Sequence, residues 1–594
     1  MEISEWLQKA QRNELSLAEL FVCAEKLQKQ SDSESALALY SAWTQGSTDA
    51  YRHVAMFNHG SLLQSLGRLD DAERVYRDCT AIAPTFAQPY VNLGLTLEKK
   101  GLRQEGIGVW STLLDLARET PGSVPDDMQV LALNHRGRVQ EDLKQYDLAE
   151  ASLQMSLDID PKQAAAIQHW VHIRQKACSW PVYKSLPGVS DNSLLMATSP
   201  LAMLALTDDP VQLLLTSHAF IHRTYDTQEE YLVKAPYEHA IKRIGYVSGD
   251  FCVHAVGLLL AELLEGHDRQ KYEIYGYDYS PEDGTEHRAR LKKSFDHIRF
   301  VHQLTDRQVA EVIASDEIDI LIDLHGLSSG ARPGIFASHP APKQGTYLGF
   351  MGTTAMPWFD FVITDKNVFT ENLRPYFVEK PLFLERCFIP LTPDVFLEGD
   401  LTRDSLGLPD HAFVMAAFGN AYKITPKLFD VWMNILRACD NAVLWLIDEN
   451  PVTTRNLKKY ITSAKIDLQR VIFSQRTNYA DYKKRLLLAD VFLDTFPYNC
   501  GSTSNNVVQA GLPMVSMFGR SMVSRMGLSI LSQIGLEDLC VSSYDQYLDT
   551  VLRIANMSPQ ERLSLKARIK PDLTGLTMAA AIEQALENLV SHEY

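Results

Sequence analysis

A 34-residue spacing in the first third of the chain is the feature that most restricts its fold. An asparagine and two glycines recur at this spacing: Asn58, Gly60 and Gly67 are followed by Asn92, Gly94 and Gly101. An alanine also stands 12 residues before a proline in two places, Ala72 before Pro84 and Ala149 before Pro161. Small residues at helix contacts and prolines at the ends of repeats are typical of stacked helix pairs. Residues 1–178 are therefore expected to form a helical solenoid.

The spacing is that of the tetratricopeptide repeat. A third repeat, from Leu133-Asn134 to Pro161, comes late because residues 119–127 are inserted before it, and residues 33–40 resemble a degenerate earlier repeat. The concave face of such a solenoid usually holds peptide, so we expect a polypeptide partner in this groove. The alternative is that the repeats only cap the neighbouring domain or dimerise, which would make the chain a homo-oligomer.

Strands and helices begin to alternate after an irregular, partly helical connector over residues 179–240. Short apolar runs at 244–247, 272–277, 318–323, 346–349 and 361–363 predict buried strands, most of them separated by helical stretches. This alternation predicts a parallel, Rossmann-like sheet over residues 241–400, with ligands bound beyond the carboxyl ends of its strands. His254, Asp323, His325 and the loop 349–354 lie at those ends.

His254 is the first candidate for chemistry in this lobe. It lies on a strand-to-helix loop beside Gly249 and Asp250. A histidine exposed to a cleft there can exchange protons near neutral pH, whereas the alternative is a solvent-facing loop histidine. His254 and His325 have no carboxylates at ligand spacing, so they make a poor metal site.

The alternation restarts after residues 404–409. Runs at 413–418, 443–447, 470–473, 490–494 and 513–517 predict a second Rossmann-like sheet over residues 401–560. Residues 561–594 are expected to be helical, and the helix at 578–589 could pack back on the first lobe. Lys423 stands between the first strand and the helix 426–439, where a point charge can hold a diphosphate. The alternative is a solvated surface lysine.

The stretch 494–513 predicts an anion-binding turn. The strand 491–493 runs into small polar residues, and a helix starts near Ser502–Ser504 and ends at Gly511. The free N–H groups and the dipole at a helix N-terminus favour negative charge, and small hydroxyl residues add donors. An ordinary strand-to-helix loop with a Ser or Thr cap is the alternative.

Composition excludes several classes of partner and location. The formal net charge of −17 argues against a general nucleic-acid or membrane binder, although a local basic cleft remains compatible with it. The N-terminus lacks the regions of a signal peptide, and no apolar run reaches membrane-spanning length. The eight cysteines are scattered without a Cys-x-x-Cys pair, which favours a reduced, cytoplasmic protein without structural zinc.

Two tandem sheets with a cleft between their strand ends indicate a nucleotide-dependent enzyme. Neither first strand leads into G-x-G-x-x-G, and no G-x-x-x-x-G-K-[ST] occurs, which weighs against dinucleotide oxidoreductases and P-loop enzymes. The two-lobed GT-B fold of nucleotide-sugar transferases needs neither motif. The predicted fold class is thus α + α/β, a tetratricopeptide-like solenoid followed by a GT-B region of two Rossmann-like lobes.

About ten motifs in one order, spread over residues 240–555, give a more specific signal. They are Arg243–Phe251 with His254, Tyr279–Thr285, Gly330–Pro333, Pro340–Gln344, Leu348–Thr354, Phe418–Pro426, Val443–Leu446, Ala489–Asp494 and Ser524–Arg525. By these motifs the chain resembles the SPINDLY / O-GlcNAc transferase family, glycosyltransferase family 41. In that family, too, tetratricopeptide repeats precede a two-lobed catalytic region.

The resemblance implies transfer of a sugar from a nucleotide diphosphate sugar to protein hydroxyls, with inversion. It implies that Lys423 stabilises the leaving diphosphate and that His254 does acid–base or positioning work. It also implies a nucleotide-sugar site made of Asn420, Gly501, Ser502, Thr503, Asn506, Arg525, Gly352 and Thr353. The resemblance also implies that no metal cofactor is needed, which agrees with the ability of Lys423 and a helix N-terminus to neutralise a diphosphate without Mg²⁺.

Departures from the family pattern leave more than one nucleotide sugar possible as the donor. Gly501-Ser502-Thr503 stands where many members have His-Thr-Thr, and Asn506 replaces a carboxylate that can hold the ribose. His254 is followed by Ala-Val where His-Pro is commoner, and the turn 496–499 resembles a bacterial branch that glucosylates asparagine. UDP-GlcNAc with Ser/Thr acceptors is the leading expectation. UDP-glucose with Asn acceptors, GDP-fucose, and a non-enzymatic repeat adaptor are the alternatives.

Overall fold

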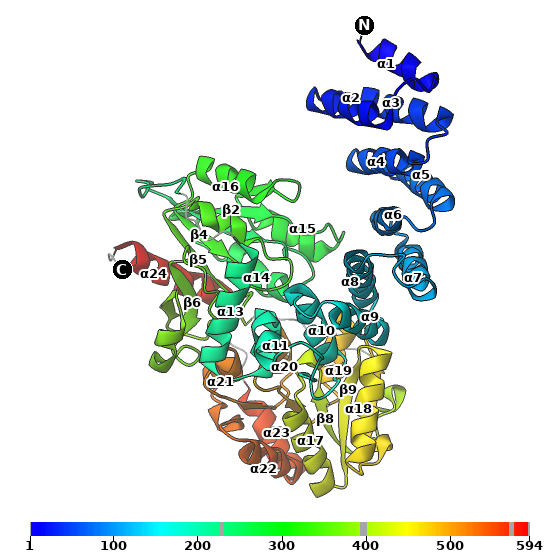
Figure 1. Cartoon of the computed structure of the whole chain (residues 1–594). Helices are drawn as coiled ribbons and strands as arrows, with labels where there is room; N and C mark the ends of the chain where they lie inside the picture. Colours follow the sequence, from blue (N-terminus) through cyan, green and yellow to red (C-terminus); the bar gives the residue numbers. More distant parts are fainter. Residues whose placement is uncertain (1, 226–230, 392–400, 570–574, 592–594) are drawn as a thin grey trace. The chain divides into compact units, whose positions relative to one another are not determined.

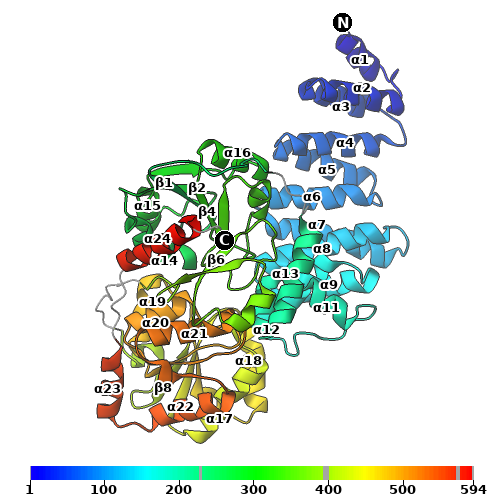
Figure 2. The same cartoon turned by 90° about the vertical axis from the view of Figure 1, so that its left-hand side faces the viewer.

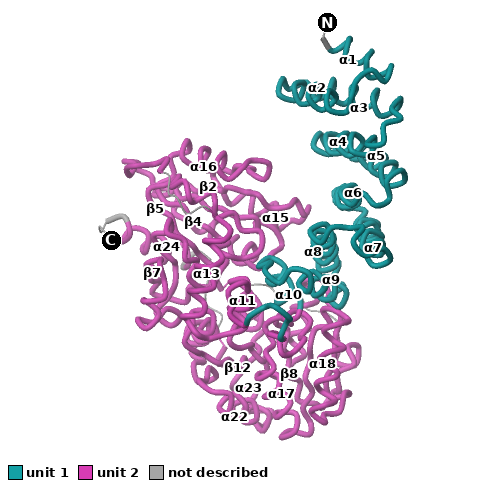
Figure 3. Tube along the Cα trace, viewed as in Figure 1, with its two compact units in different colours: residues 1–173, 185–190 teal, residues 174–184, 191–594 magenta. Residues whose placement is uncertain are grey.

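The chain is described from a computed structural model covering residues 2–225, 231–391, 401–569 and 575–591 (Figure 1). It divides into two compact units (Figure 3). Unit 1 holds residues 1–173 and 185–190, and unit 2 holds residues 174–184 and 191–594. The predicted end of the first lobe at residue 400, and the chain end at 592–594, lie outside the described residues.

Unit 1 is a run of antiparallel helix pairs stacked on one another (Figure 2). Its helices are α1 (Glu2–Gln11), α2 (Leu17–Lys29), α3 (Ser33–Gly46), α4 (Arg52–Ser65), α5 (Leu69–Ile82), α6 (Ala87–Lys99), α7 (Arg103–Glu119), α8 (Asp126–Asp142), α9 (Tyr146–Ile159) and most of α10 (Ala164–Lys176). The predicted solenoid is confirmed. Most of the inserted residues 119–127 lie in the connection between α7 and α8, which explains the late third repeat.

The repeated glycines have two separate structural roles in unit 1. A Cβ on Gly94 would lie 2.2 Å from the indole nitrogen of Trp110, and one on Gly60 would lie 2.6 Å from the Tyr76 ring. These glycines therefore let the two helices of a pair approach closely. Gly67 and Gly101 instead take left-handed φ angles of 75° and 81° in the turns that join the helices, where glycine costs no strain.

The first lobe of unit 2 contains a parallel sheet of strand order β3-β2-β1-β4-β5-β6-β7. The strands are β1 (Lys242–Ser248), β2 (Tyr272–Asp278), β3 (His297–Phe300), β4 (Ile320–Asp323), β5 (Lys343–Thr346), β6 (Phe361–Asp365) and β7 (Lys380–Leu384). The helices α14 (Ala255–Glu265), α15 (Glu286–Lys293) and α16 (Asp306–Ser315) connect its first four strands. Burial along the whole of β4 and β6, and of β1 from Ile244 onward, explains why their sequences are mostly apolar.

The second lobe repeats this topology in a parallel sheet of order β10-β9-β8-β11-β12-β13. Its strands are β8 (Phe413–Ala417), β9 (Ala442–Asp448), β10 (Val471–Gln475), β11 (Val491–Leu493), β12 (Met514–Met517) and β13 (Cys540–Val541). Its helices are α17 (Pro426–Ala438), α18 (Pro451–Ser463), α19 (Tyr479–Leu486), α20 (Ser502–Gln509), α21 (Met526–Gln533), α22 (Tyr544–Ala555) and α23 (Pro559–Arg568). In both sheets the order in which successive strands are added reverses beside the first strand, and open α/β sheets bind ligands at such a point.

Two further parts complete unit 2. The connector contributes α11 (Asp191–Ala197), α12 (Pro200–Leu206) and α13 (Pro210–Thr224), whose apolar side chains join the core of the two lobes. The last helix, α24 (Gly575–Ser591), returns to the first lobe and packs against α14 and β7 (Figure 2), as the sequence suggested. Its Glu583 accepts a hydrogen bond from the Asp268 N–H at 2.9 Å and lies 2.8 Å from the buried ring of His267.

Two sequence-based expectations concern the chain as a whole. Among the helices that the structure describes, none combines the length and the hydropathy needed to span a bilayer. All eight cysteines are free thiols.

Candidate active site

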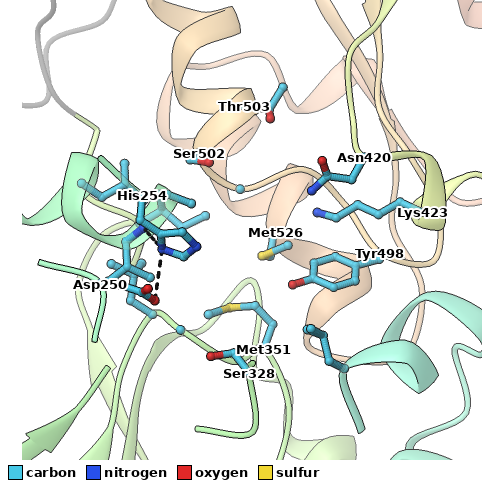
Figure 4. A pocket seen from close by; sticks show the side chains of 18 of the residues that line it. Asp250, His254, Ser328, Met351, Asn420, Lys423, Tyr498, Ser502, Thr503 and Met526 are labelled. Carbon is cyan, nitrogen blue, oxygen red and sulfur yellow. Dashed lines mark hydrogen bonds and ion pairs between the residues drawn. The ribbon is translucent and has the colours of Figure 1, made fainter. Parts of the chain in front are cut away.

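A cavity in unit 2 lies beyond the carboxyl ends of β1, β4, β5, β8 and β11 (Figure 4). The first lobe lines it with Asp250, His254, Ala255, Val256, Leu259, Ser328, Ser329, Leu348, Gly349, Met351 and Ile389. The second lobe lines it with Gly419, Asn420, Tyr422, Lys423, Tyr498, Gly501, Ser502, Thr503 and Met526, and the connector adds Leu201. The two lobes thus supply opposite walls of one site.

His254 is the cap residue of α14, and its side chain is half exposed to the cavity. Its Nδ1 atom has two neighbours: the Val256 backbone N–H at 3.4 Å, and the Asp250 carboxylate at 3.1 Å. The ring points into the cavity from the first-lobe side (Figure 4). A histidine in this position can exchange a proton with a molecule bound in the cavity.

Lys423 ends the short 3-10 helix η4 (Ala421–Lys423) that follows β8, and it points into the cavity from the opposite wall (Figure 4). The residue is 8% exposed. Its ammonium donates to the Asn499 carbonyl at 3.2 Å and lies 3.7 Å from the centre of the Tyr498 ring. No carboxylate lies within ion-pair distance of it in the described residues, so this buried cation has unused donors for an anion.

The turn between β11 and α20 is held by buried polar side chains. The Asp494 carboxylate accepts from the backbone N–H groups of Thr495 and Cys500, each at 2.8 Å, and from the Ser516 hydroxyl at 2.5 Å. Burial raises the pKa of Asp494, an effect that these hydrogen bonds oppose. Burial and then Asp494 raise the pKa of the Cys500 thiol to about 12, so this cysteine is no nucleophile at neutral pH.

This turn presents the N-terminus of α20 to the cavity. Ser502 and Thr503 open the helix and line the cavity, together with Gly501. In the part of the chain that the structure describes, no protein acceptor takes the backbone N–H groups of Ser502, Thr503 or Ser504. Free N–H groups, the helix dipole and two hydroxyls therefore stand beside Lys423 in one anion-binding wall.

A second histidine lies behind His254, as its position at a strand end suggested. The buried His325 accepts from the Gly249 N–H at 3.0 Å through Nε2, and its Nδ1 lies 2.9 Å from the Ser328 hydroxyl. Asp323 is fully buried and accepts from the N–H groups of His325 and Gly326. Burial raises the pKa of Asp323. Neither His325 nor Asp323 lines the cavity.

Six of the predicted site residues come together in the cavity: His254, Lys423, Asn420, Gly501, Ser502 and Thr503. Asn420 is held through its Oδ1, which accepts from Arg476 at 3.2 Å. The roles of these residues stay predictions, because their shared position alone does not test them.

The other four predicted site residues do not line this cavity. Thr353 donates to the buried Glu379 at 2.7 Å, and its neighbour Gly352 lies against Leu204 and Phe350. Asn506 accepts from the Tyr479 hydroxyl at 2.7 Å. Arg525 donates to the carbonyls of Asn367 and Gly519 and faces a different hollow, one it shares with Arg520. The side chains of Thr353, Asn506 and Arg525 are thus occupied by contacts within the protein.

Several lining residues were absent from the predicted site. The Tyr498 ring makes a cation–π contact with the Lys423 ammonium. Asp250, four positions before His254 in the chain, lies beside the His254 ring. Both belong to motifs visible in the sequence, which could have indicated them. Leu201 and Met526 come from distant segments, and no local pattern marks them as site residues.

Two parallel sheets of the same topology, with an anion-binding wall and a histidine across one cavity, define the GT-B class of two-lobed fold. A family model described as Glycosyl transferase family 41 matches residues 185–391 and 399–576, and a tetratricopeptide repeat model matches residues 53–86 and 130–163. The chain belongs to glycosyltransferase family 41. The resemblance inferred from the motifs is thereby confirmed.

Individual relatives agree with this assignment. A solved structure of a Thermobaculum terrenum O-GlcNAc transferase mutant aligns with a TM-score of 0.67 and 25% identity, covering 91% of this chain and 98% of that one. The chain is 33% identical over 281 residues to an Arabidopsis thaliana protein named "Probable UDP-N-acetylglucosamine--peptide N-acetylglucosaminyltransferase SEC". It is 27% identical over 363 residues to the Arabidopsis protein of that description named SPINDLY.

These alignments cover 46% and 58% of the chain but only 29% and 39% of the two plant proteins. The chain therefore spans well under half the length of these curated relatives.

Proposed function

We propose that the chain is an inverting protein glycosyltransferase that moves N-acetylglucosamine from UDP-GlcNAc to Ser or Thr hydroxyls of polypeptides. The observation that carries the proposal is that Lys423 and His254 face each other across one cavity, beside the free N-terminus of α20 (Figure 4). A cationic wall suits a diphosphate, and a proton-accepting group opposite suits an acceptor hydroxyl. The names of the relatives favour UDP-GlcNAc as donor and peptide as acceptor.

The proposed reaction is a direct displacement at the anomeric carbon. The acceptor oxygen bonds to that carbon from the face opposite the diphosphate, and the bond from carbon to diphosphate oxygen breaks. The diphosphate leaves with the electron pair, which Lys423 and the N–H groups of Ser502 and Thr503 stabilise. The hydroxyl proton passes to His254. Asn420 and Gly501 would contact the nucleotide sugar from the same wall.

Three further features belong to this proposal. The diphosphate charge is neutralised by protein groups, so turnover needs no metal ion. The acceptor polypeptide is held by the tetratricopeptide repeats, which is the usual use of such a groove. The chain works in the cytoplasm, as its free cysteines favour, and the repeats are also the natural place for any self-association.

A donor and acceptor panel tests the proposal. Thermal unfolding is followed with UDP-GlcNAc, UDP-glucose and GDP-fucose, because a ligand that binds the folded state raises the unfolding temperature. Matched Ser and Asn peptides are then incubated with the protein and each donor, and the intact mass of each peptide is measured by mass spectrometry. A gain of one N-acetylhexosamine on the Ser peptide alone is the expected result. A hexose on the Asn peptide, or a deoxyhexose on the Ser peptide, would replace the proposed donor. No transfer and no shift with any donor would favour the repeat adaptor.

A further inference from the structure

Asp250 is a largely buried carboxylate whose charged neighbours differ from those of an ordinary stabilising surface carboxylate. Its side chain is 16% exposed. In the described residues its ion-pair neighbours are two histidines: His254 Nδ1 at 3.1 Å and His325 Nε2 at 3.3 Å. No lysine or arginine compensates its charge there. Burying a carboxylate without such a partner is costly, so a purely structural role explains Asp250 poorly.

His325 leaves the carboxylate available to His254. The Gly249 N–H, at 3.0 Å from His325 Nε2, needs a lone pair on that nitrogen. A neutral His325 therefore carries its proton on Nδ1, where it can donate to the Ser328 hydroxyl at 2.9 Å. In this tautomer the nitrogen of His325 that faces Asp250 has no proton to offer. The charge of Asp250 is then directed at His254.

Two neighbours compete for Nδ1 of His254, and they favour opposite tautomers. The Val256 N–H at 3.4 Å needs a lone pair on Nδ1, which would place the proton on Nε2. The Asp250 oxygen at 3.1 Å favours a proton on Nδ1, which frees the lone pair of Nε2. A contact to a charged oxygen at the shorter distance outweighs a neutral contact near the limit of hydrogen bonding.

We propose that Asp250 is a positioning residue that selects the His254 tautomer with its proton on Nδ1 and its Nε2 lone pair open to the cavity. This inference rests on the proposed function, since it concerns how His254 takes a proton. The acceptor hydroxyl proton goes to Nε2 as the oxygen forms its bond to the anomeric carbon and the diphosphate leaves. The imidazolium that results is held by the Asp250 charge until the proton passes to solvent.

The kinetic test compares Asp250→Asn with Asp283→Asn in the full chain. Asp283 is a matched control because it accepts from the Val253 N–H at 2.9 Å on the same loop but neither contacts His254 nor lines the cavity. General bases contribute about 10²–10⁴-fold, so Asp250→Asn is expected to lower kcat about 10²-fold. The KM for the donor should stay within about twofold, and Asp283→Asn should retain most activity. Equal losses in both variants would reduce the role of Asp250 to anchoring the loop and overturn the inference.

A double-mutant cycle asks whether Asp250 acts through His254. If it does, Asp250→Asn adds no further loss in a His254→Gln background, because the group it positions is gone. Full additivity of the two losses would contradict the inference.

The tautomer itself can be measured without activity, which separates this inference from the proposed function. The carbon and nitrogen chemical shifts of the His254 ring, assigned by difference from His254→Gln, report which nitrogen carries the proton. Wild type should show the Nδ1–H form, and Asp250→Asn should move toward Nε2–H. An Nε2–H form in wild type would overturn the inference even if transfer is observed. The Nδ1–H form would support it even if the donor proves different.

Discussion

Lys423 is the residue on which the proposed chemistry depends most. Its ammonium is buried, and among the described residues its neighbours are the Asn499 carbonyl and the rings of Tyr498 and Tyr422, none of which carries a negative charge. The residue thus carries a desolvation cost that the folded protein does not fully offset, and an anionic ligand would offset it. Such a group contributes to binding and turnover more than to stability.

Lys423→Ala should therefore lower turnover without unfolding the protein. Loss of one preorganised donor costs on the order of 10²–10³ in kcat, while the unfolding temperature should stay the same or rise. Lys427→Ala is the control, because Lys427 stands in the following helix with its ammonium over the Tyr544 ring and outside the cavity. Steady-state kinetics on a Ser peptide measure the effect. Turnover near wild type in Lys423→Ala would rule out this role.

The sequence could predict some site residues and not others, for a physical reason. His254, Lys423 and residues 501–503 lie in the loops that follow β1, β8 and β11, so each parallel sheet places its residues at the edge where its strands end, and both edges line the cavity. Thr353 and Arg525 also lie in loops at this end of the sheets. Their direction, however, is decided by partners distant in sequence, Glu379 and the Asn367 carbonyl. No local pattern contains that information.

Among the helices of unit 1, the regularly spaced glycines allow the two helices of a pair to approach each other closely. Gly94→Ala should loosen α6 from α7, since the added Cβ would lie 2.2 Å from the Trp110 nitrogen. Overpacking of this kind typically costs about 1–3 kcal/mol. Gly108→Ala on α7 is the matched control: it has open space and should stabilise the helix by about 0.5–1 kcal/mol. Hydrogen exchange of α6 and α7 in the full chain measures both, and equal protection in the two variants would contradict the packing argument.

His59 on α4 should make the same unit sensitive to acid. Burial, and then the Arg68 charge, lower the pKa of His59 from 6.5 to about 4. Between these values the unfolded chain binds a proton that the folded one does not, so stability falls as the pH drops from 6.5 towards 4. The slope is at most about 1.4 kcal/mol per pH unit. Hydrogen exchange of α4 and α5 at several pH values should show this loss. His59→Phe should flatten it, whereas identical profiles would remove His59 as the cause.

Most helices and strands were predicted from the periodicity of the sequence, and those that were missed or misplaced lack a long apolar run. The start of α20 and the extent of α17 match the predicted helices closely. The strands β3, β7 and β13 were not predicted, since edge strands such as β3 and β7 are partly exposed and lack a long apolar run. The strand predicted at 346–349 is observed three residues earlier, as β5. Its sequence, Lys-Gln-Gly-Thr, is polar although largely buried, because Gln344 bonds backbone carbonyls.

At the scale of the whole molecule, an acidic chain is proposed to bind an anionic donor. The formal net charge is −17, so affinity for a diphosphate must come from local groups, which here are Lys423 and the α20 N-terminus. Transfer should accordingly persist within about twofold in excess EDTA, since preorganised protein donors stabilise the leaving group. Steady-state rates with and without chelator measure this. If EDTA abolished activity and Mg²⁺ or Mn²⁺ restored it, Lys423 and the N–H groups of α20 would not suffice to stabilise the leaving diphosphate.

Transfer of N-acetylglucosamine from this one cavity to a polypeptide hydroxyl is the activity proposed for the chain. The most direct test is the intact mass of a Ser/Thr peptide after incubation with UDP-GlcNAc and the full chain, with Lys423→Ala and Lys427→Ala alongside. The peptide should gain one N-acetylhexosamine with wild type and with Lys427→Ala, and almost none with Lys423→Ala. An unmodified peptide with wild type, or equal modification by all three proteins, would contradict it.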